Sequence, residues 1–188
     1  MITSNETARA WEQIAERPEA AGYLKVVCRT YRYPDGRTAD WDILKGGRSV
    51  AVVAFTDDDQ GILARQYRPG PDGVLGELPG GMINDGETVL EAAARELLEE
   101  TGYQATTLEI GIETYLASYA THIRYGVLAR GCRKVAEPRP DRDEFPEQLT
   151  LPLQEYVQHL LGGKYTDADV GYGCLYHGGL LTLAPGLR

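Results

Sequence analysis

Residues 81–102 read Gly-Met-Ile-Asn-Asp-Gly-Glu-Thr-Val-Leu-Glu-Ala-Ala-Ala-Arg-Glu-Leu-Leu-Glu-Glu-Thr-Gly, and this stretch decides the fold of the chain. It brings one guanidinium and four carboxylates into a short segment bounded by glycines: Glu87, Arg95, Glu96, Glu99 and Glu100. Hard divalent cations prefer carboxylate oxygens, and a cation held in this way is suited to chemistry on phosphate groups. The stretch therefore indicates a metal-dependent site for a phosphate-containing substrate.

The second half of this stretch is predicted to form a helix. From Thr88 onward the residues are good helix formers, and either Thr88 or Asp85 has a side chain suited to cap the N-terminus. Gly102 is placed to end the helix. Glu96 and Glu100 are four residues apart and share one face, where a bound cation would relieve their mutual repulsion.

This pattern resembles the signature of the Nudix hydrolases, which is a glycine, five residues, a glutamate, seven residues and then Arg-Glu-aliphatic-any-Glu-Glu-any-Gly. The chain fills every fixed position of that signature with Gly81, Glu87, Arg95, Glu96, Leu97, Glu99, Glu100 and Gly102. The one departure is Tyr103, where the family usually has an aliphatic residue. Glutamate-rich solvated helices are common, but eight fixed positions do not coincide by chance on ordinary composition.

The carboxylate pattern and the resemblance together predict the metal ligands. Glu96 and Glu100 are the expected direct ligands, and Glu99 is a third that also counts among the catalytic residues. The resemblance adds the backbone carbonyl of Gly80 as a further ligand. Mg²⁺ is the expected cofactor, with Mn²⁺ as an alternative, because Mg²⁺ favours oxygen ligands and keeps several waters.

Glu87 and Arg95 are assigned supporting roles. Glu87 precedes the helix, so we expect it to orient Arg95 or to bind a second metal through water. Arg95 lies four residues before Glu99 and can hold that carboxylate in place, which makes it a candidate catalytic residue. A purely structural ion pair between Glu87 and Arg95 is an equal alternative.

Composition favours a cytoplasmic globular enzyme. The 188-residue chain is 43% hydrophobic and 25% charged, which are ordinary values for one domain. Its net charge of -9 argues against a nucleic-acid partner, which requires a basic face. We expect no membrane partner, because the chain has no apolar run of the required length and no signal-peptide pattern at its start. The three cysteines read as reduced thiols.

The remaining pattern predicts an α/β fold. Pro34-Asp35-Gly36 between alternating segments indicates an antiparallel hairpin. We expect a single domain over residues 1–188: helix 6–17, hairpin strands 23–33 and 37–44, strands 49–55 and 62–67, the central helix, strands 108–118 and 123–129, loop 131–147, strand 149–153 and helices 152–161 and 168–181. The resemblance implies an α/β/α sandwich with a mixed β-sheet, preceded by the N-terminal hairpin.

Outside the signature, the chain resembles the ADP-ribose pyrophosphatase branch of the Nudix hydrolases. Residues 65–68 (Arg-Gln-Tyr-Arg), residues 77–81 (Glu-Leu-Pro-Gly-Gly) and the tail from residue 147 to 167 carry this resemblance. It implies hydrolysis of ADP-ribose to AMP and ribose 5-phosphate by a homodimer in which residues 1–45 help to join the subunits. Residues 118–121 lack the proline that the branch usually carries. Another nucleotide-sugar pyrophosphatase, a triphosphate or CoA hydrolase, and a non-catalytic nucleotide-binding module stay open.

Four residues outside the signature are candidates for substrate binding. Arg68 and Arg65 can read phosphate oxygens bidentately, but they point to opposite faces of one strand, so only one is expected to reach the site. Arg68 matches the family position better. Glu77 can accept a hydrogen bond from the substrate or be a structural strand residue, and Tyr119 can stack on a base or pack.

The general base is expected on the loop before the last strand. In the ADP-ribose branch a glutamate there carries or orients the attacking water, and the resemblance places that glutamate at Glu147. Glu144 and Asp143 lie on the same loop and are the alternatives.

Overall fold

The structure is a computed structural model that describes residue 22 and residues 24–139, 145–162 and 166–182. The helix predicted for residues 6–17 and the candidate base Glu144 therefore lie outside the described residues. Among the described residues, no helix is long and apolar enough to cross a membrane.

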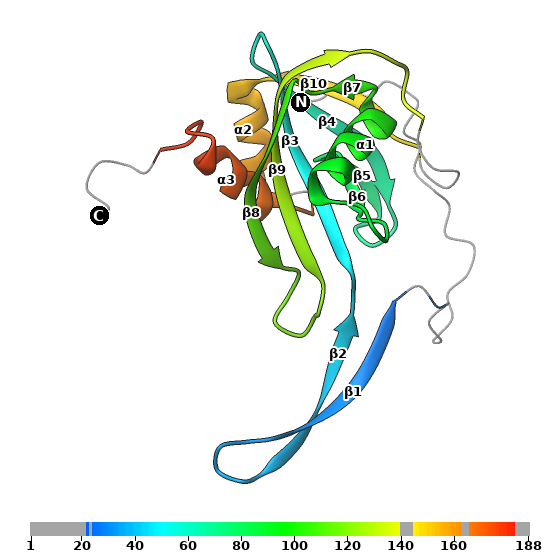
Figure 1. The fold of residues 1–188 in the computed structure, drawn as a ribbon, viewed down its shortest axis with the longest axis vertical. Coiled ribbons are helices and arrows are strands. Elements are labelled where there is room, and N and C mark those ends of the chain that lie inside the picture. Colours follow the sequence, from blue (N-terminus) through cyan, green and yellow to red (C-terminus); the bar gives the residue numbers. More distant parts are fainter. Residues whose placement is uncertain (1–21, 23, 140–144, 163–165, 183–188) are drawn as a thin grey trace.

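A mixed sheet forms the body of the molecule (Figure 1). Its strands follow the order β10-β4-β3-β9-β7, with β5 on β4, β6 on β3 and β8 on β9. The central pair, β3 with β9, is parallel, and the other pairs are antiparallel. The strands are β3 (Arg48–Thr56), β4 (Gln60–Arg68), β5 (Gly73–Glu77), β6 (Gly80–Met82), β7 (Tyr103–Gln104), β8 (Thr107–Tyr115), β9 (Ile123–Lys134) and β10 (Glu147–Pro152).

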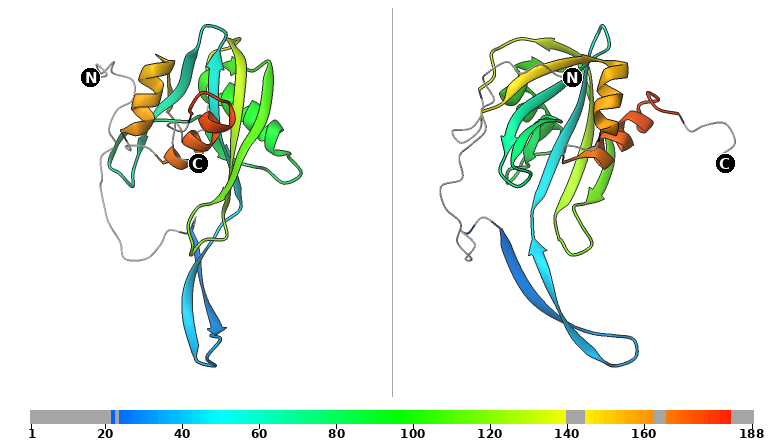
Figure 2. Two further views of the ribbon diagram at one scale, coloured as in Figure 1. Left: turned by 90° about the vertical axis from the view of Figure 1, so that its left-hand side faces the viewer. Right: turned by 180° about the vertical axis from the view of Figure 1, so that it is seen from behind.

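Helices cover both faces of this sheet, which confirms the predicted α/β/α sandwich (Figure 2). Helix α1 (Val89–Thr101) packs on one face, and helices α2 (Leu153–Leu161) and α3 (Ala168–His177) pack on the other. Strand β3 alternates between the two cores: Val52 lies in the core under α1, and Val53 lies in the core under α2 and α3. Its nearly continuous apolar run is explained by burial on both sides.

Strands β3 and β4 part soon after their shared turn. They pair at Ala54 with Ile62 and at Phe55 with Gly61. Beyond that point β4 pairs with β5, and β3 pairs with β6. No strand was predicted in residues 69–81, because five glycines and three prolines hide the strand pattern there. The two short strands lie between the separated parts of β3 and β4, and residues 77–80 pass from β4 to β3.

The predicted N-terminal hairpin is present as a separate two-stranded sheet. Strand β1 (Lys25–Arg32) pairs along its whole length with β2 (Thr38–Lys45), and the hairpin projects away from the body (Figures 1 and 2). Its base is tied to the loop between β8 and β9, where the Leu44 amide donates to the Tyr119 carbonyl at 2.9 Å and the Thr121 amide donates to the Leu44 carbonyl at 3.0 Å.

Two element boundaries differ from the prediction by four residues or more. Strand β9 continues to Lys134 instead of ending at residue 129, because Gly131 takes a positive φ of 63° at an irregularity in the pairing and lets the strand continue. Helix α3 ends at His177 rather than at residue 181. Within α3, Gly173 permits close packing, since a Cβ there would lie 2.6 Å from Ile112 Cδ1 of β8.

Candidate active site

Helix α1 is fixed at both ends by its own sequence. The Thr88 hydroxyl accepts from the Glu91 amide while the Glu91 carboxylate accepts from the Thr88 amide, which forms a capping box. Gly102 ends the helix with a positive φ of 75°, as predicted. The cap is therefore Thr88 and not Asp85. Two carboxylates of this helix, Glu96 and Glu100, face β6.

The two glycines before the helix are required by close contacts. A Cβ on Gly80 would lie 2.2 Å from the Val50 carbonyl oxygen, and a Cβ on Gly81 would lie 2.3 Å from the Glu96 carboxylate. The Gly80 amide donates to Glu100 at 2.9 Å. Glu96 and Glu100, which are both buried, thus lie against the backbone of β6.

Arg95 joins three carboxylates of the signature. Its guanidinium donates to Glu87 at 2.8 and 3.1 Å, to Glu96 at 2.7 Å and to Glu99 at 3.1 Å. It also donates to the Met82 carbonyl at 2.9 Å. The structure therefore brings together the predicted signature residues from β6, the following loop and α1.

The electrostatics of this cluster follow from those contacts. The hydrogen bonds from Arg95 and from the Asn84 amide lower the pKa of Glu87 from 4.5 to about 2. The same carboxylates raise the pKa of Arg95 above its ordinary value. Glu87 is therefore an anion at neutral pH and is committed to Arg95, which fits the predicted orienting role.

Within the described part of the chain, no three carboxylate, imidazole or thiol groups converge as a ready metal shell. Arg95 takes several of the oxygens that a cation would use. The donor set is nevertheless that of a hard cation, because Glu96 and Glu100 lie four residues apart beside the same glycine backbone. A cation would bind here by taking carboxylate oxygens from the Arg95 network.

The two candidate arginines of β4 have different partners. The Nε of Arg68 donates to Glu77, whose other carboxylate oxygen accepts from the Thr166 hydroxyl at 2.8 Å. Arg65 pairs with Glu147 at 3.5 Å. The predicted opposite orientation of the two arginines agrees with these separate partners.

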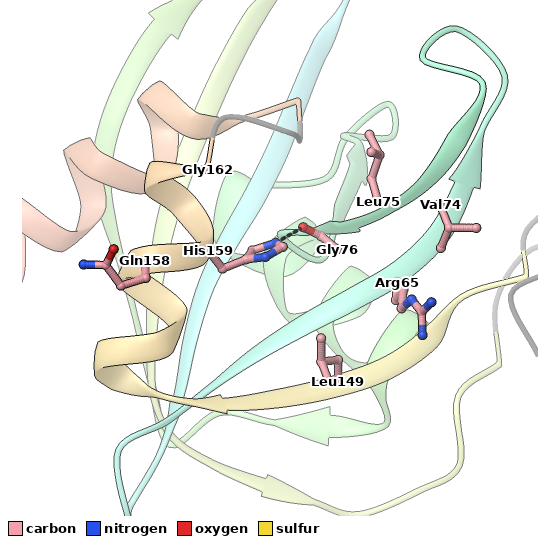
Figure 3. Close-up of a pocket in the computed structure, with 8 residues that line it drawn as sticks. All are labelled: Arg65, Val74, Leu75, Gly76, Leu149, Gln158, His159 and Gly162. Carbon is pink, nitrogen blue, oxygen red and sulfur yellow. Dashed lines mark hydrogen bonds between the residues drawn. The ribbon is translucent and has the colours of Figure 1, made fainter. Parts of the chain in front are cut away.

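The candidate base Glu147 lies on the sheet face away from α1. Leu149, two residues along β10, lines a cavity of about 430 Å³ with Arg65 and with His159 of α2 (Figure 3). Side chains two apart on a strand share a face, so Glu147 and its partner Arg65 are on the α2 side. The structure does not bring Glu147 to the α1 carboxylates, and its catalytic role stays a prediction.

A second cavity lies where the hairpin joins the body. It measures about 450 Å³ and is lined by Lys25 and Lys45 of the hairpin, by Met82 and by His122. Met82 connects it to the carboxylate cluster, because the Met82 carbonyl accepts from Arg95. Burial lowers the pKa of His122, and its Nε2 lies 2.8 Å from the Ser49 hydroxyl.

Several residues of this region were not singled out from the sequence. Met82 and Thr166 lie within stretches that carry the resemblance but fill none of their fixed positions, and the two lysines lie outside those stretches, so no sequence signal indicated them. Tyr119, which was singled out, is exposed on the loop that ties down the hairpin. Its stacking role stays a prediction.

Comparison with known proteins gives the class to which this fold and site belong. Residues 45–169 match the NUDIX domain family. The match covers most of the chain, including the whole sheet and α1, so the chain belongs to the Nudix family and is a Nudix hydrolase.

Individual relatives narrow the comparison. The ADP-ribose pyrophosphatase of Bacillus subtilis (strain 168) is 32% identical over 145 residues, which cover 76% of this chain and 78% of that protein. The ADP-sugar pyrophosphatase of Mus musculus is 31% identical over 157 residues, covering 73% of this chain and 71% of that protein. A solved structure of an ADP compounds hydrolase has a TM-score of 0.74 at 22% identity and covers 94% of this chain and 96% of its own, which shows the shared fold.

Proposed function

We propose that the protein hydrolyses the diphosphate bond of a nucleoside diphosphate sugar, with ADP-ribose as the first choice. Water would attack one phosphorus and break the bridging P–O bond, which gives AMP and ribose 5-phosphate. The observation that carries the proposal is the cluster of Glu87, Glu96, Glu99 and Glu100 around Arg95 beside the Gly80 backbone. The names of the relatives from Bacillus subtilis and Mus musculus support the substrate class.

We assign a divalent cation, with Mg²⁺ as first choice and Mn²⁺ as alternative, to Glu96, Glu100, Glu99 and the Gly80 carbonyl. The all-oxygen donor set fits such a cation. When bound, it would neutralise diphosphate oxygens and lower the pKa of the attacking water. Arg95 fixes Glu87 and holds the Glu96 carboxylate of α1 beside β6.

The cavity at the base of the hairpin supports an anionic substrate for this acidic protein. Lys25 and Lys45 line it, and Met82 joins it to the carboxylate cluster. Its volume of about 450 Å³ falls in the range of small-molecule sites. We place the nucleoside end of the substrate here, and we assign Arg68 to the diphosphate or terminal sugar.

The proton acceptor is assigned to the first residue of β10 or to the segment that precedes it. Glu147 is the first choice and Glu144 the second, although Glu147 is paired with Arg65 in this structure. Reaching the α1 carboxylates would require Glu147 to leave that pair. Slower turnover in Glu147→Gln than in Glu144→Gln supports the assignment, and the reverse order moves the base to Glu144.

We also propose that the hairpin joins two copies of the chain. Its apolar side chains are exposed, with Leu24 62%, Val26 61% and Trp41 50% accessible. A two-stranded sheet has little stability of its own. Its register puts Val26 on one face and Trp41 on the other, and packing of a second copy against the hairpin would bury such exposed apolar side chains. Trp41→Glu is expected to shift a dimer toward monomer in sedimentation experiments; a wild-type monomer at micromolar concentration contradicts the proposal. The cytoplasmic location and the absence of nucleic-acid partners stay predictions.

The activity is tested by product analysis on a substrate panel. The protein is incubated with Mg²⁺ or Mn²⁺ and ADP-ribose, other nucleotide sugars, NADH, dinucleoside polyphosphates or nucleoside triphosphates. AMP with ribose 5-phosphate as the fastest products supports the proposal, and faster turnover of another nucleotide sugar selects the second choice. Tight binding without turnover favours a non-catalytic module, and no turnover of any compound refutes the hydrolase assignment.

The metal assignment is tested by Glu100→Gln against a matched control. Glu100→Gln is expected to lower turnover at least a hundredfold, since removal of one key electrostatic contributor costs that order. Glu109 is an exposed glutamate of β8 paired with His177, so Glu109→Gln should leave turnover unchanged. Full activity of Glu100→Gln contradicts the ligand assignment.

A further inference from the structure

The arginine assigned to the substrate is connected to the loop before α3. Glu77 is 2% exposed and accepts from Arg68 on one carboxylate oxygen and from the Thr166 hydroxyl on the other. A buried carboxylate needs partners on both oxygens, because an unsatisfied buried charge is costly. Thr166 therefore completes the shell that fixes the Glu77 carboxylate.

Thr166 is itself held in place from the sheet. Its neighbour Asp167 accepts from Arg124 of β9 at 2.9 Å, and Arg124 also pairs with Asp169 in the first turn of α3. Arg124 is 8% exposed, and the pair with Asp167, whose side chain is 26% exposed, is better shielded from water than the pair with Asp169, whose side chain is 57% exposed. The start of α3 is thereby pinned to β9, and the Thr166 hydroxyl is kept over Glu77.

We propose that Thr166 is a positioning residue for the substrate: through the buried carboxylate of Glu77, its hydroxyl sets the orientation of the Arg68 guanidinium. The inference rests on the proposed function, in which Arg68 contacts the diphosphate or terminal sugar. Glu77 leaves the outer face of the guanidinium open, since Nε makes the contact and the side chain of Arg68 is 37% exposed. A guanidinium fixed through Nε presents its other N–H groups to an anion with little further ordering.

The first test is kinetic and uses ADP-ribose with Mg²⁺. Thr166→Val removes the hydroxyl and keeps the shape, and we expect KM to rise about fivefold with kcat within about twofold, because a pre-oriented contact is lost while the reacting groups are untouched. Thr166→Ser keeps the hydroxyl and should restore wild-type KM. Thr106→Val is the matched control. Thr106 lies between β7 and β8, and the substitution removes a hydroxyl that donates to the Gly131 carbonyl of β9.

A double-mutant cycle separates this role from general stability. In an Arg68→Ala background, Thr166→Val should have no further effect on KM, because both changes act through one guanidinium. Equal effects of Thr166→Val in both backgrounds overturn the inference, as does an unchanged KM in the wild-type background. Thermal unfolding of each variant checks that the effect is not a loss of folded protein.

A second measurement does not depend on activity. The Nε–H group of Arg68 can be followed by nitrogen-15 NMR, and its hydrogen-bonded signal should shift or broaden in Thr166→Val and return in Thr166→Ser. An unshifted signal overturns the inference even if the enzyme is active. A shifted signal in a protein that hydrolyses none of the panel refutes the proposed function and leaves the positioning of Arg68 by Thr166 supported.

Discussion

Replacing Arg95 by methionine tests how the carboxylate cluster is held together. Arg95→Met keeps the aliphatic stem but leaves Glu87, Glu96 and Glu99 without their shared cation. Each unit of pKa corresponds to about 1.4 kcal/mol, so lowering the pKa of Glu87 from 4.5 to about 2 sets a ceiling of about 3.5 kcal/mol on its pairing. Because the side chains of Arg95 and Glu87 are 27% and 15% exposed, screening by water reduces the expected loss to about 2 kcal/mol.

The pH dependence of this loss follows from the direction of the shift. An acid whose pKa is lowered in the folded state contributes stability above its unfolded pKa and loses it as the pH falls through the folded value. The Glu87 contribution is therefore complete above pH 4.5 and disappears toward pH 2. We would measure the free energy of unfolding by urea in EDTA, at pH 7 and at steps from pH 5 to 2.5. The difference in this free energy between wild type and Arg95→Met should become smaller as the pH falls.

A control of the same kind is available at the surface. Arg133 pairs with Asp57, and both side chains are largely exposed, so Arg133→Met should cost less than about 1 kcal/mol. Equal losses for Arg133→Met and Arg95→Met, or a gap that does not change with pH, would refute the reasoning.

Two further predictions concern the glycine contact and the thiols. Gly81→Ala places a Cβ 2.3 Å from the Glu96 carboxylate. Metal-dependent turnover should fall at least about tenfold, since small misplacements at a reacting centre are costly, while far-UV circular dichroism should change little. Unchanged turnover would contradict this contact. Cys28 is exposed, whereas burial raises the pKa of Cys132 to about 11 and of Cys174 to about 12. Ellman's reagent at pH 8 should therefore label one thiol quickly in the native protein and three in urea; rapid labelling of three native thiols would show that the core opens easily.

The signature helix was predictable because each of its features is local. Capping by Thr88, termination at Gly102 and the shared face of Glu96 and Glu100 depend on residues within one or two turns of the helix. The alternation around residues 34–36 likewise predicted the hairpin. Local spacing carries enough information when both partners of a contact lie in one element.

The short strands β5 and β6 were missed because their pairing partners are remote and their own residues are glycine-rich. Glycine and proline indicate turns in isolation, yet here Gly80 is needed for approach to the β3 backbone. The contact of Glu77 with Thr166 was equally inaccessible, because it joins the end of β5 to a residue 89 positions away, before α3. The orientation of Glu147 depended on the register of β10 against β4, which the strand pattern alone did not specify.

The parallel pairing of β3 with β9 determines when the protein can fold during synthesis. One edge of β3 stays unpaired until residues 123–134 have been made. The face of β3 that packs under α2 and α3 stays uncovered until α3 has been made. Pairing of such distant segments slows folding. Until then the run Val-Ala-Val-Val-Ala-Phe at residues 50–55 lacks its neighbours, and apolar β-prone segments of that length are prone to aggregation. The newly made chain therefore depends on rapid completion of its C-terminal third, and a stalled or truncated product ending before β9 would aggregate rather than fold.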